Sequence, residues 1–498
     1  MSAVHSTGKI VKNTILFTGA LLGQKIISLG YFFYLSSRLG PEVLGAYVWA
    51  LSFTTLFSIG MDLGLSPILI REAAKTDTQD EKYLRTVIGL KLPLIFITLI
   101  ISLFVLFLTK SDPIIIALVL GATGVMLFDA FSLTFYSFLR SKQKLGYEAM
   151  GIIIFQMITL VGGVLLLELT GNIVMVMLSL TTASFVNMIY SGIIIKKKLG
   201  YSLRPMFDKP TVKYFFRIMP AFALSGIFVR IYNVSDSVLL GYMKDNASVG
   251  LFSIPAKAVT AFQALIPGAF QATIYPSMSN YYATSRERLI NLFEKSFNYL
   301  TFVSIPIALG LFIIAGPVLQ NFWPKYTEAT LTFKVMALAI PFIFLAFPTG
   351  LLLRAADRQN ANTLNRGIIT VIAVVMNILL IPKYGVLGAG ISYLVVNIIL
   401  LFLDFIFVEK VIKYSKKNII IYFCKTLLAG MGMLFVVDGV LYFTSVYVAV
   451  LAGAMSYLVF AVLLRIIKKN ELEFLKNIFI KSKKVTEVPE PLDGEKID

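Results

Sequence analysis

Histidine and cysteine are almost absent from this sequence of 498 residues, which contains one of each. The single cysteine, Cys424, has no partner for an intramolecular disulfide, and its position within an apolar run indicates a small packing residue. The single histidine, His5, lies in the polar N-terminal tail. These two absences exclude a histidine-ligated metal cluster and leave no basis for a histidine proton relay.

Charged residues are also scarce. They make up 14% of the chain, whereas soluble domains contain about 25%. Apolar residues fall in runs of about 20 to 28, each long enough to cross a hydrocarbon core about 30 Å thick. A chain in lipid must close its backbone hydrogen bonds internally, so each run is predicted to be a helix. The first run, residues 15–35, is too long for the apolar region of a signal peptide. The sequence therefore predicts an all-α integral membrane protein.

Fourteen segments are predicted to cross the membrane. They are residues 13–37, 42–69, 85–109, 113–139, 149–168, 172–195, 214–241, 249–281, 293–316, 329–353, 364–382, 386–408, 418–443 and 446–467. With both termini in the cytoplasm, 33 Lys and Arg residues fall on the cytoplasmic side and 5 on the opposite side, which is a strong positive-inside pattern. The net charge of +18 is then explained by topology and by anionic lipid headgroups, and not by nucleic acid. We expect a multi-pass protein of the plasma or inner membrane.

The longest internal connection is basic and divides the helices into two blocks. We predict an N-terminal six-helix lobe at 1–195, a cytoplasmic basic linker at 196–213 and a C-terminal six-helix lobe at 214–408. Helices thirteen and fourteen follow at 409–468, and a cytoplasmic tail occupies 469–498. The tail is expected to begin with a short interfacial helix and to end in a disordered, charge-rich segment.

A short internal repeat accompanies the two blocks. Leu39-Gly40 precedes Gly45-Ala46-Tyr47, and Leu240-Gly241 precedes Gly250-Leu251-Phe252. In both, Leu-Gly and a polar turn lead into Gly-x-aromatic at the start of the next span. Parallel repeats of six spans are one way to build a transporter with a cavity between two bundles.

Three cations lie deep within predicted spans. Lys25 and Arg230 are near the middle of spans one and seven, and Lys257 lies about 12 Å inside span eight at 1.5 Å per residue. A charge at such a depth is costly, so each is a functional candidate, and Asn233 shares a helical face with Arg230. We predict that Lys25, Arg230, Lys257 and Asn233 bind substrate in a hydrated cavity suited to a diphosphate. A buried ion-pair network that fixes helix packing is the open alternative.

The carboxylates within spans also have two interpretations. As functional groups that bind a coupling H⁺ or Na⁺, the candidates are Asp62, Asp129 and Asp236. As structural groups, the predicted ion pairs are Asp62 with Lys91, Asp404 with Lys425, and Asp236 with Lys257 across a short loop. No metal-ligand spacing, nucleophile motif or phosphate loop is present, so no metal site, catalytic residue or cofactor is predicted.

Four stretches, in order along most of the chain, resemble the polysaccharide flippase family of the multidrug, oligosaccharidyl-lipid and polysaccharide exporter superfamily. They are Ser37 to Tyr47, Asp62 to Ala74, Ser235 to Lys257, and Pro382 to Gly390. The resemblance implies a fold similar to the MATE exporters, with two six-helix lobes in a V around a central cavity and two extra helices. In the related lipid II flippases, cations on spans one and eight contribute to the cavity, and Lys25 and Lys257 lie on those spans here.

The resemblance also implies a function. Family members flip polyprenyl-diphosphate-linked oligosaccharides from the inner to the outer leaflet for O-antigen, capsule or exopolysaccharide assembly. The expected partners are the lipid-linked oligosaccharide, membrane lipids, a polysaccharide polymerase and glycosyltransferases. The alternative is a cation-coupled MATE-type exporter of drugs or metabolites. A membrane enzyme such as a polymerase is disfavoured, because the outer loops are too short to form a catalytic site.

Overall fold

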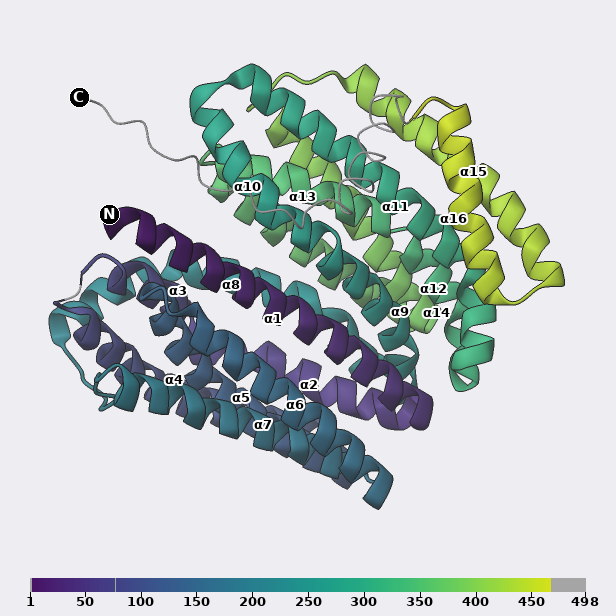
Figure 1. The fold of residues 1–498 in the computed structure, drawn as a ribbon. Coiled ribbons are helices and arrows are strands. Elements are labelled where there is room, and N and C mark those ends of the chain that lie inside the picture. Colours follow the sequence, from purple (N-terminus) through teal and green to yellow (C-terminus); the bar gives the residue numbers. More distant parts are fainter. Residues whose placement is uncertain (1, 77, 467–498) are drawn as a thin grey trace, which may run out of the picture.

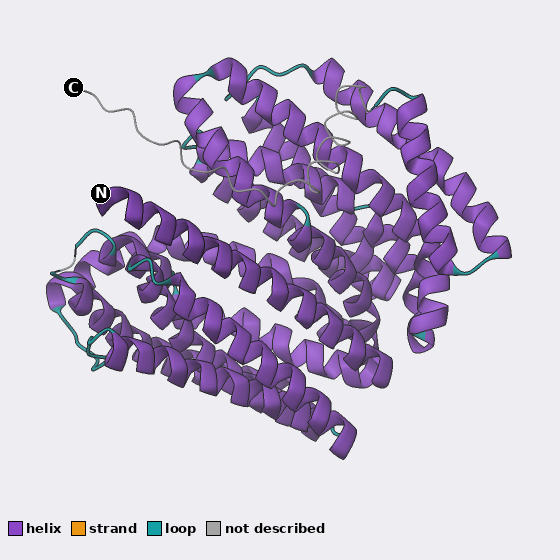
Figure 2. Cartoon of the chain, viewed as in Figure 1, coloured by secondary structure: helices purple, strands orange, loops and turns teal. Residues whose placement is uncertain are grey.

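The computed structural model describes residues 2–76 and 78–466, with the backbone alone for residues 2–16, 221, 225, 269, 272 and 273. Within these residues all regular structure is helical (Figure 2). The all-α prediction is therefore confirmed. The predicted interfacial helix and disordered tail at 469–498 lie outside the described residues.

The helices fall into two lobes (Figure 1). The N-terminal lobe contains α1 (Ser2–Arg38), α2 (Pro41–Asp62), α3 (Leu65–Ala73), α4 (Asp80–Thr109), α5 (Pro113–Ser141), α6 (Leu145–Thr170) and α7 (Ile173–Ile193), which ends in a π-helical turn at Ile194–Lys198. The crossing helix α8 (Lys209–Met243) follows. The C-terminal lobe contains α9 (Asn246–Leu265), α10 (Pro267–Thr284), α11 (Arg286–Phe322), a 3₁₀ turn (Pro324–Ala329), α12 (Thr330–Ala337), α13 (Ile340–Ala355), α14 (Gln359–Val408), α15 (Lys416–Phe443) and α16 (Val446–Leu463).

Length and apolar composition identify the helices that can cross a membrane. Twelve helical segments of the described chain are long and apolar enough to span it, without α1 and with α14 counted once. In α14 the chain reverses at Gly385, whose φ of 57° favours glycine. Asn365 bonds to Asp404 across the resulting hairpin, which therefore contributes two passes. With α1 and the second pass of α14, the twelve become the predicted fourteen.

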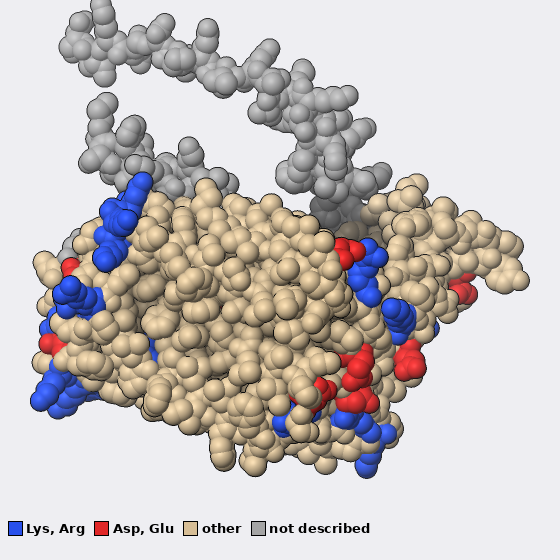
Figure 3. All heavy atoms as spheres, turned by 90° about the horizontal axis from the view of Figure 1, so that it is seen from below, with Lys and Arg blue, Asp and Glu red and all other residues tan. Residues whose placement is uncertain are grey.

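The charge distribution fits a membrane span. In the view of Figure 3, Lys and Arg gather at one end of the molecule, and Asp and Glu lie with further Lys and Arg at the other. The broad surface between the two ends is almost free of charge. An uncharged belt of this kind is what lipid tails require of a protein surface.

The second pass is a broken helix. α2 ends at Asp62, and both Leu63 (φ 40°) and Gly64 (φ 81°) adopt left-handed backbone conformations before α3 begins. A Cβ atom at Gly64 would also lie 2.7 Å from the Cβ of Phe222 on α8, so glycine meets a conformational and a steric requirement. The break leaves backbone groups without helical hydrogen-bond partners inside the lobe. The Asp62 carboxylate accepts a hydrogen bond from one of these groups, the Ser66 N–H, at 3.4 Å.

The two lobes meet through α1, α2 and the crossing helix α8. α2 and α1 pack against α9, and α8 packs against α2 and α3 on one side and against α14 on the other. The contact between α2 and α9 occurs at Gly45 and Gly250, which are the equivalent glycines of the sequence repeat. The two-lobe architecture is thus present, while the residue bounds assigned to each lobe stay a prediction.

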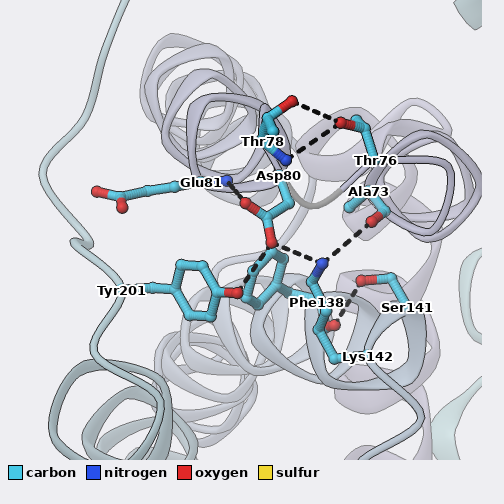
Figure 4. A network of polar contacts seen from close by, with 9 residues as sticks. All are labelled: Ala73, Thr76, Thr78, Asp80, Glu81, Phe138, Ser141, Lys142 and Tyr201. Carbon is cyan, nitrogen blue, oxygen red and sulfur yellow. Dashed lines mark hydrogen bonds and ion pairs between the residues drawn. The ribbon is translucent and has the colours of Figure 1, made fainter.

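The connection from α7 to α8 is bound to the N-terminal lobe (Figure 4). Asp80, which is 2% exposed, accepts a hydrogen bond from the Tyr201 hydroxyl at 2.9 Å and pairs with the Lys142 ammonium at 2.6 Å. Further along, hydrogen bonds from Thr211 and Lys82 lower the pKa of Asp208 to about 2. Asp208 therefore stays ionised at neutral pH and holds the start of α8 beside α4.

We expect Asp80→Ala to release this connection, because Lys142 and Tyr201 would lose their shared acceptor. Chymotrypsin should then cleave after Tyr201 several-fold faster in the detergent-solubilised protein. Asp112→Ala, which removes the helix cap of α5, is the matched control and should leave the cleavage rate unchanged. An unchanged rate in Asp80→Ala would mean that backbone hydrogen bonds alone, such as Met206 N–H to Arg85 O, hold the connection.

Candidate functional site

A cavity with a volume of about 550 Å³ lies inside the N-terminal lobe. Its walls come from α1, α2, α3, α5, α6, α7 and α8. We call it the N-terminal chamber. Its charged lining residues are Asp62, Asp129, Arg140 and Arg230. The broken helix places Asp62 and the first turn of α3 directly in the wall.

Asp62 is paired with a lysine buried behind the wall. The Lys91 Nζ lies 2.6 Å from the Asp62 carboxylate, and the lysine side chain is 0% exposed. Lys91 also donates to the Ala130 carbonyl at 3.0 Å. The predicted Asp62–Lys91 pair is confirmed. It neutralises Asp62 and ties α2 to α4 and α5.

The other charged groups of the chamber are balanced as well. The Arg140 guanidinium donates to the Glu148 carboxylate at 2.8 Å and 2.5 Å. Asp129 and Arg230, on α5 and α8, attract one another electrostatically without forming a salt bridge within the described chain. The chamber therefore has two ion pairs, and its four charged lining residues, two acidic and two basic, sum to no net charge.

Lys25 on α1 and Lys257 on α9 belong to different lobes. Both side chains are exposed, and neither forms a salt bridge with any residue that the structure describes. The two ammonium groups are close enough to repel one another, and the Lys257 Nζ lies 5.3 Å from the centre of the Phe32 ring. The prediction that Lys257 pairs with Asp236 is wrong, because Lys257 faces α1 and Asp236 faces α14.

A second, smaller cavity of about 160 Å³ lies in the C-terminal lobe, between α8, α9, α13 and α14. Asp236 lines it and accepts a hydrogen bond from the Asn377 amide. The Tyr232 hydroxyl donates to Asn397 at 3.2 Å in the same cavity. Arg366 is the cation in its wall. We call it the C-terminal cavity.

Asp404 lies beyond this cavity and is fully buried. Its carboxylate accepts hydrogen bonds from Asn365 at 2.8 Å and Thr349 at 3.0 Å. The predicted pair with Lys425 is wrong. The reason is that α15, which carries Lys425, packs against α11 and α16 and not against α14. Similar depth in the membrane did not bring the two residues together.

The four predicted substrate-binding residues occupy three places. Arg230 lines the N-terminal chamber, Asn233 lines the C-terminal cavity, and Lys25 and Lys257 lie between the lobes. The ion-coupling candidates are divided in the same way, with Asp62 and Asp129 in the chamber and Asp236 in the C-terminal cavity.

Several lining residues were not predicted from the sequence. Arg140 lies at the end of its span, where the positive-inside pattern already explains a cation. Gln24, Tyr136 and Asn187 are uncharged, and their position in the wall depends on which helix face points inward. Arg366 is also near a span end. Its position in the wall of the C-terminal cavity distinguishes it from a cation that faces lipid, and the sequence does not show this position.

A two-lobed bundle of fourteen membrane passes, with a broken helix and ionisable groups in internal cavities, defines a membrane transporter fold. Residues 10–282 match the model of the polysaccharide biosynthesis protein family. Because the match covers more than half of the chain, this protein belongs to that family.

Curated relatives are distant in sequence. The chain is 23% identical over 386 residues to the probable low-salt glycan biosynthesis flippase Agl15 of Haloferax volcanii, covering 76% of this chain and 78% of the relative. It is 22% identical to the capsular polysaccharide biosynthesis protein CapF of Staphylococcus aureus, covering 75% and 93%. The probable flippase AglR of Haloferax volcanii is 23% identical over 168 residues, 33% of this chain and about a third (35%) of that protein.

Solved structures share the fold. The lipid II flippase MurJ in an inward closed conformation superimposes with a TM-score of 0.74 at 18% identity, covering 91% of this chain and 99% of that one. An inward-facing MATE family multidrug transporter gives a TM-score of 0.64 at 14% identity, covering 78% and 94%. These similarities support the MATE-like architecture predicted from the sequence.

Proposed function

We propose that this protein translocates a polyprenyl-diphosphate-linked oligosaccharide from the inner to the outer leaflet of the cell membrane, by alternating access between its two lobes. The observation that carries the proposal is the pair Lys25 and Lys257. Two ammonium groups, one from each lobe, are close enough to repel one another, and neither forms a salt bridge with a described residue. Like charges at this depth are unfavourable unless an anion lies between them, and a diphosphate supplies that charge.

The relatives favour a saccharide-bearing substrate. Agl15 and AglR are described as probable flippases, and CapF as a capsular polysaccharide biosynthesis protein. A cation-coupled drug exporter would share the fold, and the family and these relatives favour the flippase over it. In this proposal both termini are cytoplasmic, and glycosyltransferases and a polymerase act before and after the flipping step.

Coupling to H⁺ or Na⁺ is part of the proposal. Asp236 is the first candidate, because it lines a cavity and its polar partner is a neutral amide, Asn377. A carboxylate without a basic partner can take up a cation without breaking an ion pair. Asp129 is the second candidate, and Asp62 is the third, because Lys91 already neutralises it.

The test is to replace the cations one at a time. Lys25→Ala and Lys257→Ala are each expected to reduce flipping of the lipid-linked glycan at least tenfold in proteoliposomes, because each removes a positive charge that meets the diphosphate. Arg230→Ala is expected to reduce flipping as well, because it leaves Asp129 in the N-terminal chamber without its opposite charge. Lys425→Ala, at a cation within α15 and away from both cavities, is the control. Membrane insertion should be normal in all four variants, and unchanged flipping in both lysine variants, Lys25→Ala and Lys257→Ala, would refute the cationic pathway.

A further inference from the structure

We propose that the N-terminal chamber binds uncharged sugar units of the glycan, while the diphosphate binds separately between Lys25 and Lys257. This inference rests on the proposed function and divides the substrate into two parts. The division follows from a contrast in charge between two neighbouring places in the structure. The lysines between the lobes lack ion pairs, whereas the chamber has two ion pairs and an adjacent Asp129 and Arg230, so its charges cancel.

The charge balance of the chamber disfavours an anion. Asp62 and Asp129 both line the wall. A diphosphate placed there would lie beside two carboxylates and would have to compete with Glu148 for Arg140, which already holds it through two hydrogen bonds. A neutral ligand meets no such competition, because it leaves each ion pair intact.

The polar groups that remain free in the chamber suit hydroxyl groups. The Ser137 Oγ is fully buried, lines the chamber and has no hydrogen-bond partner. Asn187, which is 8% exposed, uses its carbonyl oxygen to accept from the Tyr136 hydroxyl, and its amide N–H groups form no hydrogen bond within the described chain. An amide and a hydroxyl that converge on one cavity can donate to and accept from adjacent sugar hydroxyls.

The size and the apolar part of the wall fit a sugar as well. A volume of about 550 Å³ falls within the range of about 300 to 1,000 Å³ that small-ligand sites occupy. Phe155 and Phe222 line the chamber beside the polar groups. The electron-rich face of an aromatic ring packs well against the weakly positive C–H groups of a pyranose ring. Gln24 lines the chamber and is the sequence neighbour of Lys25, so the sugar and diphosphate sites would be adjacent.

Ligand-observed saturation-transfer NMR on the full-length protein in detergent tests the inference. The probes are free glucose, N-acetylglucosamine, glucuronate and pyrophosphate. We expect a neutral sugar to bind with millimolar affinity and pyrophosphate not to displace it. Asn187→Ala should reduce the sugar signal at least fivefold, while Lys25→Ala and Lys257→Ala should leave it unchanged.

A second variant distinguishes loss of sugar binding from loss of folding. A Cβ atom at Gly226 would meet no atom within 4 Å, and Gly226 lines the chamber. Gly226→Trp should therefore fill the chamber, abolish the sugar signal and keep the melting temperature within a few degrees of wild type.

Three results would overturn the chamber assignment: no neutral sugar binds, pyrophosphate displaces the sugar, or Asn187→Ala or Gly226→Trp keeps the full sugar signal with a normal melting temperature. Normal flipping by both Lys25→Ala and Lys257→Ala would instead count against the proposed function. The two failures are therefore distinguishable.

Discussion

Replacing Gly45 or Gly250 by alanine is expected to abolish flipping, although neither residue contacts a charged group of the candidate site. A Cβ atom at Gly45 would overlap the Asn246 carbonyl and lie 2.8 Å from the Gly250 nitrogen. A Cβ atom at Gly250 would overlap the Pro41 carbonyl in the same way. These neighbours are backbone atoms, which cannot rotate away. Even one methyl group must therefore push α2 and α9 apart.

The separation should appear as exposure of Trp49. This residue is fully buried on α2, donates to the Val238 carbonyl at 3.3 Å and packs against Lys110, whose Nζ lies 4.8 Å from its ring centre. The chain has two tryptophans, so a Trp323→Phe background isolates the emission of Trp49. We expect acrylamide to quench that emission several-fold more efficiently in Gly45→Ala than in the background protein.

Gly310→Ala is the matched control for the glycine pair. It also lies within a membrane helix, but a Cβ atom there would meet nothing within 4 Å. Flipping and Trp49 quenching should both be normal in this variant. If Gly45→Ala retained flipping with Trp49 still protected, the lobes would have to close through some contact other than this helix crossing.

The same glycines show how far sequence reasoning extends. The repeat was visible as Gly45 and Gly250 at equivalent positions, but nothing in the sequence stated that the two would touch. The number of passes was predictable because run length and charge alternation are properties of each segment alone. The break at Leu63 and Gly64 was not predicted, and the contact that requires glycine at position 64 comes from Phe222 on α8, far away in the sequence.

The candidate site was predicted in part, for a related reason. Helical periodicity placed Arg230 and Asn233 on one face, since residues three apart differ by about 60° around a helix. α8 lies between the two lobes, so this small angle is enough to direct Arg230 to one cavity and Asn233 to the other. The depth of a residue along its membrane span can be predicted from the sequence, whereas the neighbouring helix that it contacts cannot.

Lys91→Met is expected to destabilise the protein more than any other single change considered. Lys91 is fully buried, and its removal would leave the Asp62 carboxylate, 20% exposed, without its counter-charge. Removing one partner of a buried pair costs about 3 to 5 kcal/mol. The expected result in detergent is a melting temperature lower by ten degrees or more, with reduced yield from the membrane. Asp62→Asn should have an effect of similar size, because it leaves a buried ammonium unpaired.

The double variant Asp62→Asn with Lys91→Met separates structure from function at this pair. Removing both charges restores neutrality, so the melting temperature should recover most of the single-variant loss, as measured by thermal unfolding of the purified protein. Lys75→Met, at an exposed lysine that pairs with Glu72, controls for the substitution itself and should have a melting temperature near that of wild type.

If the double variant is stable and flips normally, Asp62 and Lys91 only fasten α2 to α4. If it is stable but inactive, the carboxylate at the helix break takes part in transport. A charge with only a packing role is not needed for flipping once its partner charge has also been removed.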